Sequence, residues 1–378
     1  ALPILKIAIR LHPEMRRRSV TAARMLEERP WRAVLQEWSE PGGLRDQYER
    51  ANLALQDIDL GSSTDDDLLA HVRRTIDHGL EMWEMHFRLH NYDLGPIGIL
   101  LDAAAQWNLS SAEVITLLEG ASPSTSDAER RLRRIREAVE AAGADPTTID
   151  ELRAVSAAVA ADVDAFLRLR GRLVVTRYDI DGLTLAESPQ LLLSTILAAR
   201  DDRDRAGRAA ESLAARTAAV RDRVPADHRA EFDLYLAEAR AAMDLRDDNG
   251  PHTIEWPLGL IRSAMLEVGR RLVAAGRASS AEHALELHPD EVAAALSGGG
   301  PSGPELAARQ HWRQHVDVES APRRIGTPEP TPPVEVLPEA MGRIVRLVQR
   351  VLAEAGIDGE VRTQGLHGVG VRSEEHTS

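Results

Sequence analysis

Apolar residues recur at three- and four-residue spacing along most of this chain, from residue 13 to about residue 316. This spacing places them on one face of an α-helix, whereas a half-buried strand requires strict alternation. Ala and Leu supply much of the apolar content, and both are strong helix formers. No alternation of strand and helix patterns is present, so a doubly wound sheet is not expected. The sequence therefore predicts an all-α fold, a multi-helix domain with long antiparallel helices over residues 1–320.

Capping residues and prolines predict where individual helices begin and end. Thr64 can cap a helix whose first turn is acidic, and we expect that helix to end near His90. Pro96 fits the first turn of the next helix, which should end near Trp107. The other predicted helices cover residues 13–38 with an interruption at Pro30, a segment capped by Ser110, and residues 126–142, 147–170, 190–220, 225–246, 252–275, 279–296 and 303–316.

The charge balance argues against two classes of binding partner. The net charge is −14 and Lys6 is the only lysine, which argues against nucleic acid and against an anionic membrane surface. No apolar run approaches the ~18 residues that a membrane-spanning helix needs. The chain has no cysteine, so disulfides and thiolate metal sites are excluded, and a cytoplasmic location is expected.

The composition changes towards the C-terminal side. Residues 321–338 contain six prolines and no helical pattern, which predicts a semi-extended linker. Pro338 then starts an amphipathic helix that ends by Gly356, and the glycine-spaced run up to Val371 is typical of chain entering another domain. We therefore interpret residues 339–371 as a connector helix and the truncated start of a further domain.

Both ends of the sequence look cut. The chain begins with Ala1 and continues as though in the middle of a domain. Residues 372–378 match what a common sequencing adapter encodes when it is translated in frame. We therefore expect a fragment of a larger enzyme with a non-native tail.

A pair of histidines is the first candidate for chemistry. His86 and His90 stand four residues apart on one predicted helix face, the spacing that two metal-ligating imidazoles need. However, Phe87 occupies the position where a zinc protease helix carries its general base, and no further ligand is evident. We therefore expect no metal site and interpret the pair as polar contacts or as lining of a substrate pocket.

Two other patterns are weaker. Asp201, Asp202 and Asp204 invite comparison with the magnesium sites of all-α prenyl-transfer enzymes, but they lack the one-turn spacing and lie among arginines. We interpret them as a salt-bridged surface. The glycine-rich loop at residues 298–303 has no lysine and no preceding strand, so it does not predict a phosphate-binding loop.

A crowded segment lies between two predicted long helices. Residues 246–257 combine charged, amide and aromatic groups around Gly250 and Pro251. We predict a helix-breaking turn here, with Gly250 as the C-cap of the first helix. Such a turn is either a plain connection or a place that directs polar side chains into a cleft.

Several stretches together resemble one known family. They are Trp83-x-x-His86-Phe87-x-Leu-His90-x-x-Asp93-Leu-Gly-Pro-Ile-Gly98, Leu117–Pro123, Arg172–Pro189, Leu245–Pro251, Glu255–Pro257, Arg262, Gly269–Leu272 and Leu366–Val371. In this order they resemble the phosphoenolpyruvate-utilising family, which includes phosphoenolpyruvate synthase-like proteins and rifampicin phosphotransferase. The resemblance covers nearly the whole chain.

The resemblance implies a place in a three-part enzyme. In such enzymes an ATP-grasp domain transfers phosphate from ATP to a histidine on a mobile domain, which carries it to an acceptor at a second site. This chain would be the helical region that holds the small-molecule acceptor. The parent would use ATP and Mg²⁺, whereas this chain would bind no cofactor. The phosphorylated histidine would lie beyond residue 371, so no catalytic residue is expected here.

The resemblance and the polar clusters give the candidate residues for acceptor binding. They are His86, His90, Asp93, Arg172, Arg246, Asp247, Asn249, Glu255 and Trp256. Positions 169–172 read Leu-Arg-Gly-Arg where the family often has Tyr-Gly-x-Arg, and positions 91–92 do not hold the expected small pair. Pyruvate, a rifamycin-like drug and another hydroxyl compound therefore all stay open as the acceptor. The alternative function is a non-catalytic helical scaffold or adaptor, in which these residues serve as caps and salt bridges.

Overall fold

The computed structural model describes residues 2–198, 203–317, 322, 326, 333–354 and 356. These residues form helices and no β-strand; Val174 and Thr184 make only an isolated antiparallel bridge. The predicted all-α class with long antiparallel helices is therefore confirmed. Most of the predicted proline-rich linker, all of residues 357–371 and the predicted adapter-derived tail at 372–378 lie outside the described residues.

Most of the helices follow one another through short connections, and residues 171–188 form a longer one between α9 and α10. In the first half they are α1 (Leu2–Leu11), α2 (Pro13–Glu28), α3 (Trp31–Ser39), α4 (Leu44–Gln56), α5 (Asp65–Gln106), α6 (Ser111–Ile115), η1 (Thr116–Leu118), α7 (Pro123–Ala141), α8 (Ile149–Ala154) and α9 (Ala157–Arg170). In the second half they are α10 (Pro189–Ala198), α11 (Arg203–Arg223), η2 (Ala226–His228), α12 (Arg229–Gly250), η3 (Pro251–Glu255), α13 (Trp256–Ala274), η4 (Ala281–Glu286), α14 (Val292–Leu296), α15 (Gly303–His315), η6 (Val334–Val336) and α16 (Glu339–Glu354). Helices α1 and α4 were not predicted from the sequence.

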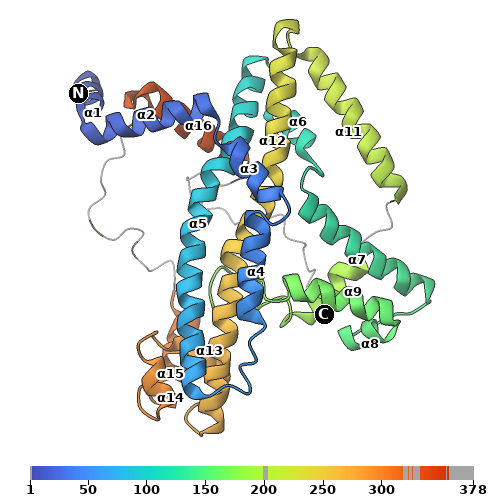
Figure 1. The fold of residues 1–378 in the computed structure, drawn as a ribbon, viewed down its shortest axis with the longest axis vertical. Coiled ribbons are helices and arrows are strands. Elements are labelled where there is room, and N and C mark those ends of the chain that lie inside the picture. The colour runs from blue at the N-terminus through green and yellow to red at the C-terminus, as the bar shows by residue number, and fades with distance from the viewer. Residues whose placement is uncertain are drawn as a thin grey trace.

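Two long helical rods form the centre of the molecule. Helix α5 runs in one direction, and α12, η3 and α13 form one rod beside it in the opposite direction (Figure 1). Helices α7 to α10 form a separate group to one side, with their own apolar cluster. Helices α14 and α15 pack near the end of the rods at which α5 begins, which is the lower end in Figure 1.

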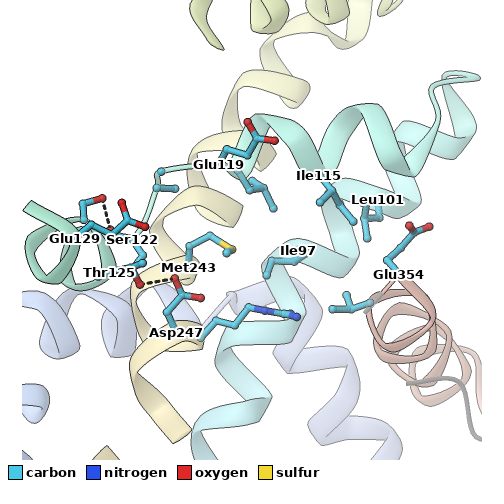
Figure 2. Close-up of a pocket in the computed structure, with 16 residues that line it drawn as sticks. Ile97, Leu101, Ile115, Glu119, Ser122, Thr125, Glu129, Met243, Asp247 and Glu354 are labelled. Carbon is cyan, nitrogen blue, oxygen red and sulfur yellow. Dashed lines mark hydrogen bonds between the residues drawn. The ribbon is translucent and has the colours of Figure 1, made fainter. Parts of the chain in front are cut away.

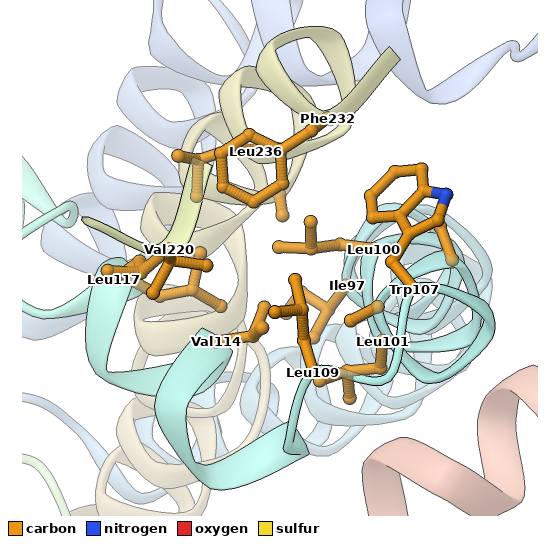
Figure 3. Packing of buried hydrophobic residues seen from close by; sticks show 14 of the residues in the cluster. Ile97, Leu100, Leu101, Trp107, Leu109, Val114, Leu117, Val220, Phe232 and Leu236 are labelled. Carbon is orange, nitrogen blue, oxygen red and sulfur yellow. The ribbon is translucent and has the colours of Figure 1, made fainter. Parts of the chain in front are cut away.

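Apolar side chains from both rods build the core at the upper end. Leu100 of α5 and Trp107, the residue after its end, face Phe232 and Leu236 of α12, and Val114 of α6 closes the group (Figure 3). Leu100, Val114 and Phe232 are completely buried. Burying side chains of this size contributes roughly 1.5–3 kcal/mol each.

Helix α5 is longer than the sequence predicts. Its start agrees with the prediction, because the Thr64 hydroxyl accepts a hydrogen bond from the Asp67 N–H at 3.1 Å. The predicted break before Pro96 is wrong, because the helix continues through this proline. An interior proline costs about 3 kcal/mol, which the burial of neighbouring residues such as Ile97 offsets.

Helices α2 and α3 are fixed to the second rod by a buried carboxylate. Glu238 on α12 accepts hydrogen bonds from the Trp31 indole at 3.2 Å and from the guanidinium groups of Arg29 and Arg32 at 3.1 and 2.7 Å. Its side chain is only 9% exposed, so these donors are what make its burial tolerable. This contact holds α2 and α3 in place beside α5.

Helix α16, predicted from residue 338 to 356, packs across α5 and α2. Gly98 on α5 makes the crossing possible, because a Cβ atom there would lie 2.9 Å from Leu347 Cβ and 3.0 Å from Leu347 O. Gly95, one turn earlier, faces Trp31 with room for a methyl group at 3.6 Å. An alanine side chain therefore fits at position 95 but not at position 98.

This difference makes a testable prediction. Gly98→Ala should loosen α16 because Leu347 backbone must move, whereas Gly95→Ala should stabilise α5 by up to about 1 kcal/mol through helix propensity. Hydrogen exchange of residues 339–354 should accelerate in Gly98→Ala and stay unchanged in Gly95→Ala. Equal protection of α16 in both variants would show that the Gly98 contact does not hold this helix.

Candidate functional site

The second rod carries a π-helical segment at its middle. Residues Pro251–Glu255 form η3, which continues α12 directly into α13. The predicted helix-breaking turn is therefore wrong: Gly250 has φ −56° and ψ −56°, which is helical and not a left-handed C-cap. Pro251 cannot donate a backbone hydrogen bond, and the wider π turn accommodates it without ending the rod. Such π segments inside helices are frequent at functional sites.

Two histidines of α5 face this segment. His86 Nδ1 lies 3.1 Å from the Thr253 hydroxyl, and Asn249 Nδ2 donates to the His86 carbonyl at 3.1 Å. His90 Nε2 lies 3.0 Å from His86 Nε2, and His90 Nδ1 lies 2.9 Å from the Asp93 carboxylate. A continuous chain of hydrogen bonds thus joins Asp93, His90, His86, Thr253 and Asn249. We call this set the histidine chain.

The two ends of the histidine chain are buried. Asp93, Asn249 and Thr253 are each 0% exposed, whereas His86 and His90 are partly accessible. One carboxylate oxygen of Asp93, Oδ1, has no hydrogen-bond partner among the described residues. Buried polar atoms without a partner are rare in folded proteins and call for an explanation. Here the unpaired oxygen lies in the group that holds His90.

A second histidine array packs on the other side of η3. Asn52 donates to the His252 carbonyl at 3.0 Å and accepts from His78 Nε2 at 2.8 Å. His252 in turn donates from Nδ1 to the Asp248 carbonyl at 3.1 Å and lies between Trp38 and Trp256. The π segment is therefore held by side chains from α3, α4 and α5.

Burial lowers the pKa of three histidines around η3. For His78 and His252, desolvation is the main cause. For His86, desolvation is again the largest cause and the neighbouring His90 adds to it, whereas Asn249 and Asp93 oppose it. All three imidazoles are thus poorer bases in the folded protein than in the unfolded chain.

Two cavities flank the crossing of α16 over α5. One, of about 540 Å³, lies between α2, α3, α5 and α16 and has His90 on its wall. Its lining is mostly apolar, with Arg17 and Arg18 among its few polar groups. The other, of about 390 Å³, lies between α5, α7, α12 and α16. Figure 2 shows Met243 and Asp247 of α12 at this second cavity, with Glu354 of α16 across from them.

The structure distributes the sequence-predicted site residues over three places. His86, His90, Asp93 and Asn249 meet in the histidine chain. Arg246 and Asp247 line the 390 Å³ cavity. Arg172, Glu255 and Trp256 lie in neither group. Thr253, which joins the two rods, was missed by sequence reasoning; its position four residues after Asn249 is the only signal that could have indicated it.

The remaining three predicted site residues, Arg172, Glu255 and Trp256, make structural contacts between segments of the chain. Arg172 donates to Ser263 at 2.9 Å, Glu255 accepts from Tyr178 at 3.1 Å, and the Trp256 indole donates to Gln56 at 2.9 Å. These contacts hold the hairpin-like segment 171–187 and helix α4 against the second rod. Among the described residues they make no contact with the histidine chain that the structure records.

Arg262 fastens the same segment from inside the core. Its side chain is 2% exposed and donates to the Glu187 carboxylate at 2.9 to 3.2 Å and to the Ile180 carbonyl at 3.1 Å. Burial tends to raise the pKa of Glu187, but hydrogen bonds from Arg262 and Thr184 outweigh it, and the net pKa is lowered. The nearest other carboxylate is Glu282, at 3.8 Å.

The two carboxylates around Arg262 allow a matched comparison. Glu187→Gln should lower the free energy of unfolding by about 3 kcal/mol, because it leaves a buried guanidinium without its counter-charge. Glu282→Gln should cost less than about 1 kcal/mol, because this carboxylate is half exposed and distant. Chemical denaturation of both variants measures this difference, and equal losses would contradict the assignment.

A further prediction concerns pH. Because the pKa values of His78, His86 and His252 are lowered on folding, the unfolded chain binds more protons below the ordinary histidine pKa of 6.5. The stability contributed by these neutral imidazoles is complete above that value and is lost as the pH falls below it.

The measurement is the free energy of unfolding at pH 7.5 and at pH 5.5. It should be higher at pH 7.5, and His252→Phe should reduce the difference because it removes one titrating group from a site already lined by Trp38 and Trp256. His12 is exposed, so His12→Gln should leave the difference unchanged. A pH dependence that is identical in His252→Phe and the unmodified chain would contradict the prediction.

Two kinds of feature are absent among the described residues. No group of three or more His, Asp or Glu side chains among them is arranged to hold a metal ion. Within the same part of the chain, no helix has both the length and the apolar character to span a bilayer. Asp201 and Asp202 lie outside it. Comparison with protein-family models, curated proteins and solved structures finds no match to this chain.

Proposed function

We propose that this chain is the acceptor-binding helical region of an ATP-dependent phosphotransferase of the phosphoenolpyruvate-utilising type. The observation that carries the proposal is the hydrogen bond from the Asn249 side chain to the His86 carbonyl, between residues 163 positions apart. It joins the stretch Trp83–Gly98 to the stretch Leu245–Pro251, and both belong to the ordered set that resembles this family. The meeting point lies beside a cavity of ligand size.

Helix α16 supports the same proposal. It occupies the sequence position of the expected connector and forms one wall of both cavities. A connector in this position would bring a following phosphohistidine domain close to an acceptor bound against α5. The histidine on that domain and the ATP-grasp domain belong to the parent enzyme, with ATP and Mg²⁺ as its cofactors.

The acceptor fits the 540 Å³ cavity better than the smaller one. Its mostly apolar lining suits a ligand with an apolar body, and His90 offers a polar group for a hydroxyl. Arg17 and Arg18 supply positive charge, although Glu14 also engages both. A hydroxyl-bearing molecule with an apolar body is therefore the acceptor class that we favour over pyruvate.

One observation favours the alternative of a non-catalytic scaffold. Arg172, Glu255 and Trp256 act as structural contacts and leave only part of the candidate set near a cavity. The scaffold predicts that neither cavity binds a ligand. Ligand binding therefore separates the two functions.

The test is calorimetric titration of the chain with pyruvate, a rifamycin and a panel of hydroxylated apolar compounds. At least one compound of the last two kinds should bind, and Ala22→Phe, which fills the larger cavity, should abolish binding. Ala121→Phe, which fills the smaller cavity, is the matched control and should leave binding unchanged. The chain alone should not hydrolyse ATP.

Three results would contradict the proposal. Absence of binding by every compound favours the scaffold. Loss of binding only in Ala121→Phe shifts the acceptor to the other cavity and removes His90 from its site. ATP hydrolysis by the chain above background contradicts the domain assignment.

A further inference from the structure

When the hydroxyl hydrogen of Thr253 is used on Asn249, the hydrogen bonds of the histidine chain call for one more proton than two neutral imidazoles supply. At one end, a carboxylate only accepts hydrogen bonds, so the 2.9 Å contact with Asp93 requires a hydrogen on His90 Nδ1. In the middle, the two Nε2 atoms of His86 and His90 are 3.0 Å apart, so one hydrogen must lie between them. These two contacts account for two ring hydrogens.

The other end of the chain can use a third. Asn249 Nδ2 donates to the His86 carbonyl, which fixes the amide so that its oxygen faces the Thr253 hydroxyl at 3.0 Å. The Thr253 hydroxyl also lies against the Asn249 carbonyl, and when its single hydrogen is used on Asn249, His86 Nδ1, 3.1 Å from the hydroxyl, donates to it. When the hydroxyl hydrogen is used on His86 Nδ1 instead, the same contacts hold a neutral pair.

Three ring hydrogens on two imidazoles correspond to one positive charge. The balancing charge is the carboxylate of Asp93, which is completely buried. The other groups around the pair are the uncharged Asn249 and Thr253 from the second rod, and Arg17 and Arg18 from α2 across the cavity. The arrangement of hydrogen bonds is therefore complementary to a pair that has gained one proton.

We infer that His86 and His90 act together as the base that takes the proton from the acceptor hydroxyl during phosphate transfer. This inference rests on the proposed function. In the transfer, the P–N bond of the phosphohistidine breaks, the P–O bond to the acceptor forms, and the hydroxyl proton passes to the neutral imidazole pair. The donor histidine, which carries a hydrogen on its other ring nitrogen, takes back the electron pair of the P–N bond and leaves as a neutral imidazole, and the charge gained by the pair is balanced by Asp93.

The neutral pair is suited to receive this proton. If His90 keeps its hydrogen on Nδ1 for Asp93 and His86 keeps its own for Thr253, the two Nε2 lone pairs face each other. A hydroxyl hydrogen that enters between them supplies the missing donor. His90, 36% exposed at its side chain, lines the 540 Å³ cavity and provides the route. Fixed partners that fit the protonated state favour the transition state over the ground state.

A bound metal ion is the competing explanation for two facing Nε2 atoms. Histidine ligands commonly carry an oxygen partner on the other ring nitrogen, as His86 and His90 do. However, the described residues offer no third ligand from a carboxylate or histidine side chain. The experiment therefore includes Zn²⁺ as a probe.

The test follows the ¹⁵N shifts of the histidine rings by NMR as the pH is changed, in the chain itself. His86 and His90 should take up one proton in a single shared step, with the rings in the tautomers derived above. His311 and His315 on α15 are also four residues apart and stacked at 4.1 Å, and they serve as the internal comparison. The structure records stacking but no ring-to-ring hydrogen bond for this pair, so its ¹⁵N shifts should show no hydrogen shared between the two rings.

Two variants test the partners. Asp93→Asn should weaken proton binding by the pair by about tenfold or more, because it removes the buried counter-charge. Glu84→Gln, on the exposed face of the same helix, should leave it unchanged. If Asp93→Asn does not fold, Thr253→Val serves instead: it removes the acceptor for His86 Nδ1–H and should also weaken proton binding.

The outcomes separate this inference from the proposed function. Independent titration of the two rings, or unchanged proton binding in the folded variants of Asp93 and Thr253, overturns the shared base. Binding of Zn²⁺ at micromolar concentration with loss of the shared proton assigns the pair to a metal and also overturns it. If the shared proton is present but no acceptor binds in the calorimetric test, the proposed function fails and the base assignment fails with it. If an acceptor binds and the rings titrate independently, only the shared base fails.

Discussion

The antiparallel contact between α5 and the rod formed by α12, η3 and α13 is the interaction on which the rest of the structure depends. Each rod is long enough to reach both apolar clusters, one around Leu100 and Phe232 and the other around Val72 and Val268. Helices α3, α4 and α16 pack against these rods, whereas α7 to α10 pack mainly on one another. A long contact of this kind fixes the register of the two rods, because a shift by one turn would separate every buried pair. It is this fixed register that brings His86 opposite Thr253.

The π segment determines which polar side chains of the second rod meet α5 at this contact. In a regular α-helix, successive side chains point about 100° apart around the helix axis. The extra residue of the π turn shifts these directions in the second rod, so the side chains after η3 face other neighbours than they would in a regular helix. Pro251 explains why the wide turn lies here, because a proline cannot complete the usual backbone hydrogen bond. The consequence is that Thr253 and Asn249 both point to α5 while His252 points to α3 and α4. Two histidine arrays are thereby placed on opposite sides of one short segment.

The sequence predicted the existence of most helices but not how the long ones continue. Apolar spacing and caps such as Thr64 are local signals, and the structure agrees with them. Pro96 and Pro251 are also local signals, but the helix breaks that they predicted are absent, because packing of the rods outweighs the cost of one interior proline. The same limit applies to the site. His90 and Asp93 are three residues apart on one helix, so their contact could be predicted, whereas the contact of His86 with Thr253 depends on the register of the two rods.

Helix α16 links the two cavities to the packing of α5. Because α16 lines both cavities, each cavity is complete only while this helix stays packed against α5 at Gly98. A ligand that contacts both helices therefore stabilises the packed position of α16, and thermodynamic reciprocity requires that packing of α16 strengthens binding of the ligand by the same factor. His90 lines the larger of these cavities, so its exposure there depends on the same contact. The position of α16 thus determines both the shape of this cavity and the exposure of His90 to a ligand within it.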